Sequence, residues 1–264
     1  MKFLLRFRAL RILSYLCLVL AWLLLENNVI GLFIYNQYPN MEEKPQISEE
    51  KFWEAATPLP QEGDLAYAMR MNGLVHSRML RSEPTLAIPT IFENYILWYQ
   101  GKQLGQHEWI SLKKAIRYGG GLSSQSALAL VGLMQEQGIE GKRLDLSGHV
   151  VAELKIGGKN LIFDPDQGVD FSYSLDELRQ KPEVLFATYL KADAKIPPEQ
   201  AQSQARDMVQ RLTGAKNPQR LNHDPAAEQA SLLLIWLIPL GLLTLGGLLW
   251  PLEKYLLKPS SETE

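Results

Sequence analysis

Two long apolar stretches lie near the ends of the chain, and a region of mixed polar and apolar pattern separates them. The first stretch is uncharged over residues 12–25 and becomes apolar again over 29–35, after a short polar interruption. The second stretch carries no charge over residues 229–252. A membrane-spanning helix needs about 20 mostly apolar residues. The pattern therefore predicts two transmembrane segments, within 1–35 and at 230–252.

The first apolar stretch has the form of an uncleaved signal anchor. A cleavable signal ends in small residues, whereas this run ends in Leu-Leu-Leu-Glu, so a cleaved signal is the alternative interpretation. Basic residues favour the cytoplasmic side of a span. They precede the first span and follow the second, at Lys2, Arg6, Arg8, Arg11, Lys254 and Lys258. Both termini are therefore expected in the cytoplasm, with the protein in the inner (plasma) membrane and the central domain periplasmic or extracellular.

The region between the spans begins with helical periodicity. Residues 36–65 are polar and contain several prolines, which is typical of a tether. Apolar faces at helical spacing predict helices over 66–80, 87–100 and 123–137. For the third helix, Ser123 or Ser124 is expected to cap the start and Gly138 to end it.

The pattern then changes to that of strands. Residues 150–156 and 160–163 are predicted as two strands joined by a tight turn at Gly157-Gly158. Ser174 and Glu177 have the spacing of a capping box, which opens a helix. A further helix is expected over 200–212, followed by a linker at 213–229 and a cytoplasmic tail at 253–264. The predicted class is α+β, with a helix packed on a small antiparallel sheet in a domain spanning residues 66–212.

The charge balance, the cysteine count and the motifs of the chain exclude several classes of function. The 264 residues include 27 Lys and Arg against 29 Asp and Glu, which argues against a nucleic-acid binder. The single cysteine, Cys17, excludes an internal disulfide framework, a cysteine-rich zinc site and a CxxC redox centre. Nucleotide-binding glycine motifs and HExxH are absent from the sequence. The sequence gives no reason to expect a metal or an organic cofactor.

The second span contains small residues that suit close helix packing. Gly241, Gly246 and Gly247 lie among leucines, at spacings that let two helices approach each other. Packing against the first span of the same chain and packing against a partner protein are equally compatible with this pattern.

Ser123, His149 and Asp164 form the one constellation that suggests chemistry. If Gly157-Gly158 is a two-residue turn, the two strands pair so that residue numbers sum to 315. His149 and Asp164 then become diagonal neighbours on one face of the sheet. A carboxylate there would orient the imidazole. Asp166 satisfies the same geometry, so the register alone leaves both carboxylates open.

Ser123 stands at the start of a predicted helix, where backbone N–H groups and the helix dipole favour a negative charge. The preceding run of glycines, 119–121, lets a backbone approach closely. The ordinary alternatives are equally simple: Ser123 can be an N-cap, His149 a packed residue, and Asp164 with Pro165 the end of a strand.

These residues resemble the core of the transglutaminase-like superfamily, in its bacterial membrane-anchored form. Members carry G-x-C-x-x-x-A at the start of a helix, then Gly-Ile, then a histidine opening a strand, then aspartate before proline. The corresponding segments here lie within residues 112–170, about a fifth of the chain: Gly121-Leu122-Ser123-Ser124-Gln125-Ser126-Ala127, Gly138-Ile139, Gly148-His149-Val150 and Asp164-Pro165. The resemblance implies a papain-like fold with a Cys-His-Asp triad, in which His149 matches the base and Asp164 the orienting carboxylate. An upstream side chain often helps to hold the oxyanion in such folds, and Asn94, Trp98 and Gln100 are the candidates.

The chain departs from this family at the nucleophile, because Ser123 occupies the position of the cysteine. A thiol with an ordinary pKa of about 8.5 can become a standing thiolate, whereas a serine hydroxyl must lose its proton during attack. Two functions follow. The first is a non-catalytic domain that binds a protein or glycan-assembly partner in an envelope, polysaccharide or peptide process. The second is a hydrolase or acyl-transferase that uses Ser123, His149 and Asp164.

Overall fold

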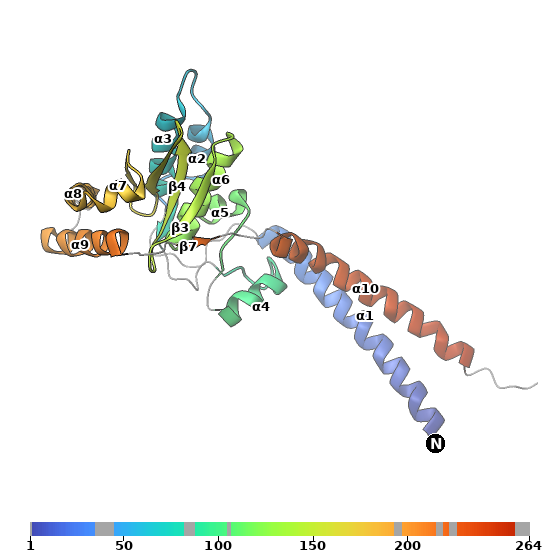
Figure 1. Ribbon diagram of the computed structural model, residues 1–264. Coiled ribbons are helices and arrows are strands. Elements are labelled where there is room, and N and C mark those ends of the chain that lie inside the picture. Colours follow the sequence, from blue (N-terminus) through green and yellow to red (C-terminus); the bar gives the residue numbers. More distant parts are fainter. Residues whose placement is uncertain are drawn as a thin grey trace, which may run out of the picture. The chain divides into compact units, whose positions relative to one another are not determined.

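The computed structural model describes residues 2–34, 45–81, 88–104, 107–192, 197–214, 219–221 and 226–256 (Figure 1). They belong to two compact units. The terminal unit contains Met1–Gln37, Pro89–Leu104 and Ala226–Glu264. The central unit contains Tyr38–Ile88 and Gly105–Pro225.

Two long helices dominate the terminal unit: α1 (Lys2–Ile34) and α10 (Ala226–Leu256). Their segments Ala9–Phe33 and Glu228–Pro251 are long and apolar enough to cross a membrane, which supports the two spans expected from the sequence. α1 is continuous through the polar interruption at residues 26–28, so the two apolar pieces of the first stretch form a single helix.

α1 and α10 pack antiparallel through small and polar side chains. Ser14 Oγ donates to the carbonyl of Gly246 (2.8 Å), and Asn28 Nδ2 donates to that of Ile235 (2.6 Å). A Cβ on Gly246 would lie 2.8 Å from Leu18 Cγ, so the helices approach closely because this residue is glycine. The glycine of the second span therefore contacts the first span of the same chain, and the start of α1 lies at the same end of the helix pair as the end of α10.

The helix predicted over 87–100 begins later than expected. α4 spans Tyr95–Leu104, and residues 90–93 form a turn in which Glu93 N–H donates to the carbonyl of Thr90 (3.1 Å). Asn94 Oδ1 then accepts from the backbone of Ile96 and Leu97, at 3.1 and 3.0 Å, so Asn94 caps the helix. Residues 89–104 also belong to the terminal unit, although the sequence placed them in the central domain.

The central unit is built on a five-stranded sheet in the order β6-β5-β4-β3-β7 (Figure 1). All neighbouring strands in it are antiparallel. The strands span Gly141–Asp145 (β3), Val150–Ile156 (β4), Lys159–Asp164 (β5), Val169–Asp170 (β6) and Gln219–Leu221 (β7). The α+β class with an antiparallel sheet is thus confirmed.

The hairpin between β4 and β5 has the predicted register. Ile156 pairs with Lys159 and Ala152 with Phe163, so the paired numbers sum to 315. Gly157 and Gly158 both have positive φ, +58° and +77°. A two-residue turn of this kind needs positive φ at both central positions, which glycine adopts without strain.

Helix α6 (Ser123–Glu136) packs on one face of the sheet, together with α2 (Glu49–Ala56) and α3 (Asp64–Arg78). Two shorter elements precede α6, namely α5 (Leu112–Tyr118) and the parallel pair of β1 (Leu80–Arg81) with β2 (Gly120–Gly121). The core here is made by apolar side chains of both layers, among them Leu130, Met134, Leu154 and Phe163.

The ends of α6 differ in part from expectation. The N-cap is Leu122, with extended backbone and no side-chain cap, so the prediction that Ser123 or Ser124 caps the helix is wrong. Both serines instead lie inside the first turn. At the other end Gly138 has φ +77°, and Ile139 N–H reaches back to the carbonyl of Met134 (2.9 Å). This end is a Schellman motif, which needs the glycine predicted there.

The predicted tether at 36–65 contains α2, which is part of the core. Ser48 caps this helix by accepting from Lys51 N–H (3.2 Å), and Phe52 is fully buried. Residues 35–44 lie outside the described part of the chain. The apolar residues of this region are too few to show helical periodicity, because the helix has only eight residues.

Three helices cover the opposite face of the sheet: α7 (Leu175–Arg179), α8 (Pro182–Ala192) and α9 (Pro198–Gly214). The capping box of Ser174 and Glu177 is confirmed at the start of α7. α9 contains the helix predicted over 200–212. The predicted linker at 213–229 begins inside α9 and also contains β7 and the first residues of α10. A second core of buried side chains fills this layer, among them Leu144, Ile162, Leu178, Leu185 and Leu212.

Candidate functional site

Ser123 is the first residue of α6 and is partly exposed. Its Oγ accepts a hydrogen bond from the backbone N–H of Val150, at 3.2 Å. Val150 opens β4 and directly follows His149. The start of α6 and the start of β4 are therefore joined at this hydroxyl, one residue from the predicted base.

His149 and Asp164 meet as the hairpin register predicts. His149 Nε2 lies 2.7 Å from Asp164 Oδ2, and the two side chains are 3% and 0% exposed. For the alternative carboxylate, Asp166, the backbone carbonyl faces His76 Nδ1 at 3.1 Å, and Oδ2 accepts from Gln167 Nε2 at 3.4 Å. The buried hydrogen bond of His149 is therefore made with Asp164, the carboxylate that the family resemblance implies.

Tyr189 of α8 completes the buried group, and sequence reasoning missed it. Its hydroxyl donates to Asp164 Oδ2 (2.8 Å), the same oxygen that faces His149. Asp164 Oδ1 accepts from Gln167 N–H at 3.3 Å. Burial raises the pKa of the Tyr189 hydroxyl well above its ordinary value of 10.0, and the nearby charge of Asp164 raises it further. Tyr189 is therefore a neutral donor that holds the carboxylate in place.

This arrangement fixes which imidazole nitrogen can act as a base. Asp164 accepts from Nε2, so in the neutral ring Nε2 carries the proton and Nδ1 keeps the lone pair. A buried carboxylate in this position also stabilises the imidazolium that forms when Nδ1 takes a proton. His149 thus has the support that a general base requires.

A second group of buried side chains surrounds the first turn of α6. Gln125 holds the backbone of Trp109 on both sides: its Oε1 accepts from Trp109 N–H (2.6 Å), and its Nε2 donates to the Trp109 carbonyl (2.9 Å). The Trp109 ring packs on Tyr118, with centroids 5.0 Å apart, and beneath Lys114 Nζ at 4.3 Å. The sequence motif gives this glutamine no role, and the structure shows that it fixes segment 107–111 to α6.

Arg143 of β3 adds a buried charge beside the same turn. Its side chain is 2% exposed and pairs with Glu108 Oε2 at 3.0 Å. The same guanidinium lies 3.4 Å from the carbonyl of Ser124. A positive charge is thereby fixed close to the residue that follows Ser123. No sequence signal identified it, because β3 itself was not predicted.

The three candidates for an oxyanion donor do not belong to this unit. Asn94, Trp98 and Gln100 lie in the terminal unit, where Asn94 Nδ2 donates to Ser231 Oγ at 3.1 Å. Asn94 therefore stabilises the packing of α4 on α10. Among the residues that the structure describes, there is no group of three or more His, Cys, Asp and Glu that could hold a metal ion.

Comparisons with models of protein families, with curated proteins and with solved structures found no match. The central unit brings Ser123, His149 and Asp164 to neighbouring positions at the ends of α6, β4 and β5, and Tyr189 supports them from α8.

Proposed function

We propose that the chain is a membrane-anchored, extracytoplasmic protein of transglutaminase-like type whose central unit is a non-catalytic binding module. The observation that carries the proposal is the serine at the head of α6. Ser123 stands where such a domain needs a thiol, and its Oγ accepts the N–H of Val150. The only thiol of the chain, Cys17, is buried in α1 and belongs to the other unit.

The chemical difference between the two nucleophiles supports this proposal. A helix N-terminus and a nearby histidine can keep a cysteine as a thiolate at neutral pH. The same surroundings leave a serine protonated, so it needs a tuned base and an oxyanion hole at the moment of attack. The buried His149–Asp164–Tyr189 group then serves to fix the ends of β4, β5 and α8.

The membrane anchors suit a scaffold. α1 and α10 are long and apolar enough to span a membrane, and their antiparallel packing brings the start of α1 and the end of α10 to one side. Basic residues near both termini favour the cytoplasm for that side. The partner we propose for the central unit is a protein or a glycan-assembly component of the envelope.

A specific observation favours one second function, a serine hydrolase or acyl-transferase. His149 keeps a buried carboxylate at 2.7 Å, and that carboxylate keeps its own donor, Tyr189, at 2.8 Å. A domain without catalysis has no chemical need for an oriented base. In this alternative Ser123 attacks, His149 accepts its proton through Nδ1, and Asp164 stabilises the resulting imidazolium.

A serine-directed fluorophosphonate probe separates the two functions. The full-length protein in lipid vesicles is treated with the probe, beside Ser123→Ala and His149→Ala variants whose folding is checked by circular dichroism. The proposal predicts no labelling of the folded wild type above the Ser123→Ala background. Labelling of Ser123 that is lost in His149→Ala would overturn the non-catalytic proposal and establish the hydrolase.

A further inference from the structure

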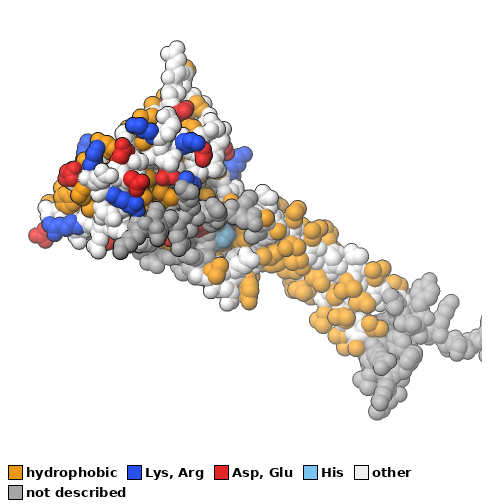
Figure 2. Space-filling model, in the orientation of Figure 1, with side chains coloured by type: hydrophobic (Ala, Val, Ile, Leu, Met, Phe, Trp, Pro, Cys, Tyr) orange, Lys and Arg blue, Asp and Glu red, His pale blue; other side chains and the backbone are white. Residues whose placement is uncertain are grey.

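The terminal unit carries an exposed apolar patch that is formed by two segments, the last turns of α1 and the turn before α4. Its members are large side chains exposed to solvent near the end of α1 and in the turn before α4: Val29, Leu32, Phe33, Ile91 and Phe92. Leu32 and Phe33 are 66% and 84% exposed. The space-filling view shows apolar side chains along the pair of long helices (Figure 2). We refer to the five residues as the collar.

Contacts with α1 fix the turn before α4 at the level of the collar. Asn27 Nδ2 donates to the carbonyl of Ile91 at 3.0 Å. The carbonyl of Phe92 lies so close to Gly31 that a Cβ on this glycine would overlap it. The backbone of residues 91–92 therefore lies directly on the last turns of the apolar segment Ala9–Phe33.

Contacts with α10 fix the start of α4 at the same level. Asn94 Nδ2 donates to Ser231 Oγ (3.1 Å), and Tyr95 OH lies 3.4 Å from the carbonyl of Ile235. Ser231 and Ile235 stand three and seven residues inside the apolar segment Glu228–Pro251. At 1.5 Å per residue, these contacts lie roughly 5 and 10 Å along α10 from the end of that segment. The whole 24-residue segment is about 36 Å long, against a hydrocarbon core about 30 Å thick, so this level lies at the outer edge of the hydrocarbon core, next to the headgroups.

The turn is suited to a medium with little water. Thr90 N–H and Oγ1 both donate to Glu93 Oε2, at 2.8 and 3.0 Å, and Asn94 caps the first N–H groups of α4. Backbone polar groups at membrane depth must find partners inside the protein. Tyr and Trp side chains are also frequent near the headgroups of a membrane, and residues 95–99 contain three: Tyr95, Trp98 and Tyr99.

We propose that Pro89–Leu104 is a third membrane-contacting element, and that lipid of the leaflet around the C-terminal end of α1 covers the collar. The occupant is lipid because Val29 and Phe33 continue an exposed apolar stripe of α1 that begins, at helical spacing, with Tyr15 and Trp22. The element lies along the interface and does not span, since α4 has only ten residues. The inference rests on the membrane anchoring in the proposed function.

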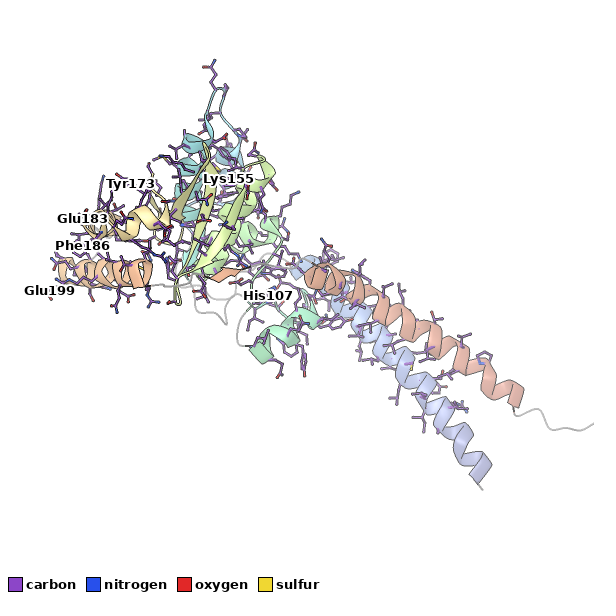
Figure 3. All side chains as sticks on the ribbon, viewed as in Figure 1. His107, Lys155, Tyr173, Glu183, Phe186 and Glu199 are labelled. Carbon is purple, nitrogen blue, oxygen red and sulfur yellow. The ribbon has the colours of Figure 1, made fainter. Side chains whose placement is uncertain are left out.

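Single-cysteine labelling tests this inference, because the chain has only one cysteine to remove. In the Cys17→Ala background of the full-length protein, cysteines are placed at Phe92 and, separately, at Ile91. Two matched controls are Leu20→Cys, which is exposed in the middle of α1, and Glu183→Cys, which is exposed on α8 of the central unit (Figure 3). Each variant carries an environment-sensitive fluorophore and is reconstituted in phosphatidylcholine vesicles with a nitroxide quencher held either near the headgroup or deep in the acyl chain.

The inference predicts that labels at 91 and 92 lose most of their fluorescence with the shallow quencher, while the label at 183 keeps its fluorescence with both. The label at 20 is expected to lose more with the deep quencher. If the labels at 91 and 92 keep their fluorescence, as the label at 183 does, while the label at 20 is quenched, the spans are inserted and the inference is overturned. If the label at 20 also keeps its fluorescence, the membrane anchoring of the proposed function is wrong.

Discussion

Replacing Tyr189 with phenylalanine removes one hydroxyl from the buried group and leaves the ring in place. The hydroxyl donates to Asp164 Oδ2 at 2.8 Å, and both residues are almost completely buried. A hydrogen bond to a charged group contributes about 1.5–3 kcal/mol to stability. Because no cavity larger than one oxygen is created, we expect the free energy of unfolding to fall by this amount and no more.

The same substitution changes how stability depends on pH. Burial and the neighbouring Asp164 raise the pKa of Tyr189 in the folded protein, so the unfolded chain loses this proton first as the pH rises. The contribution of Tyr189 is complete below the ordinary tyrosine pKa of about 10 and is lost as the pH rises above it. Tyr189→Phe has no such proton to lose. Its stability therefore declines less steeply than that of the wild type above pH 10.

Thermal melting followed by circular dichroism measures both effects in the full-length protein. For a unit of this size the loss corresponds to a melting temperature lower by roughly 3–12 °C at neutral pH, at 2–4 °C per kcal/mol. Tyr173→Phe is the matched control, since Tyr173 is only partly buried and its ring lies beneath Lys181 Nζ at 4.1 Å. An unchanged melting temperature together with an unchanged alkaline decline in Tyr189→Phe would refute the structural role assigned to this hydroxyl.

Three further substitutions test other parts of the structure by denaturation of the full-length protein. Phe52→Ala is expected to lower the free energy of unfolding by about 3–5 kcal/mol, because the ring is fully buried; a loss near zero would show that α2 is a tether after all. Arg78→Ala removes bonds to the carbonyls of residues 47, 116 and 117, so we expect a loss on the order of 3 kcal/mol or more. Asp170→Asn is expected to raise the free energy of unfolding at pH 7, because burial raises the pKa of this carboxyl and so disfavours its charged form. The gain should disappear as the pH falls to 3.8, the ordinary pKa, where the wild-type carboxyl is protonated in the folded protein. A gain that does not depend on pH would contradict this reasoning.

The local parts of the site could be predicted because they depend on short-range geometry. Two glycines in succession set a two-residue turn, the turn set the register, and the register placed His149 next to a carboxylate. The register alone does not distinguish Asp164 from Asp166, because it places both carboxylates on the same face as His149. The choice of Asp164 came from the family resemblance, and the structure agrees with it.

The remaining parts depend on contacts between segments that are distant in sequence. Tyr189 stands in an apolar helix 25 residues from Asp164, and nothing in its surroundings marks it as a partner. The cap of α6 was wrongly assigned because serine is a frequent N-cap, while here extended backbone at Leu122 starts the helix without a side-chain bond. Segment 89–104 was placed in the central domain because neighbouring sequence was assumed to fold together. Its polar contacts with residues 27, 231 and 235 show otherwise.

The central claim is that the site keeps the base and its supports but lacks the thiol, and restoring the thiol tests it most directly. Ser123→Cys in the Cys17→Ala background is reacted with iodoacetamide in lipid vesicles near neutral pH, with and without His149→Ala. The account predicts rapid alkylation that slows to the rate of an ordinary thiol when His149 is removed, since the N–H of Val150, the helix start and the imidazole all favour a thiolate. Slow alkylation at the same rate in both backgrounds, with the fold intact, would contradict it.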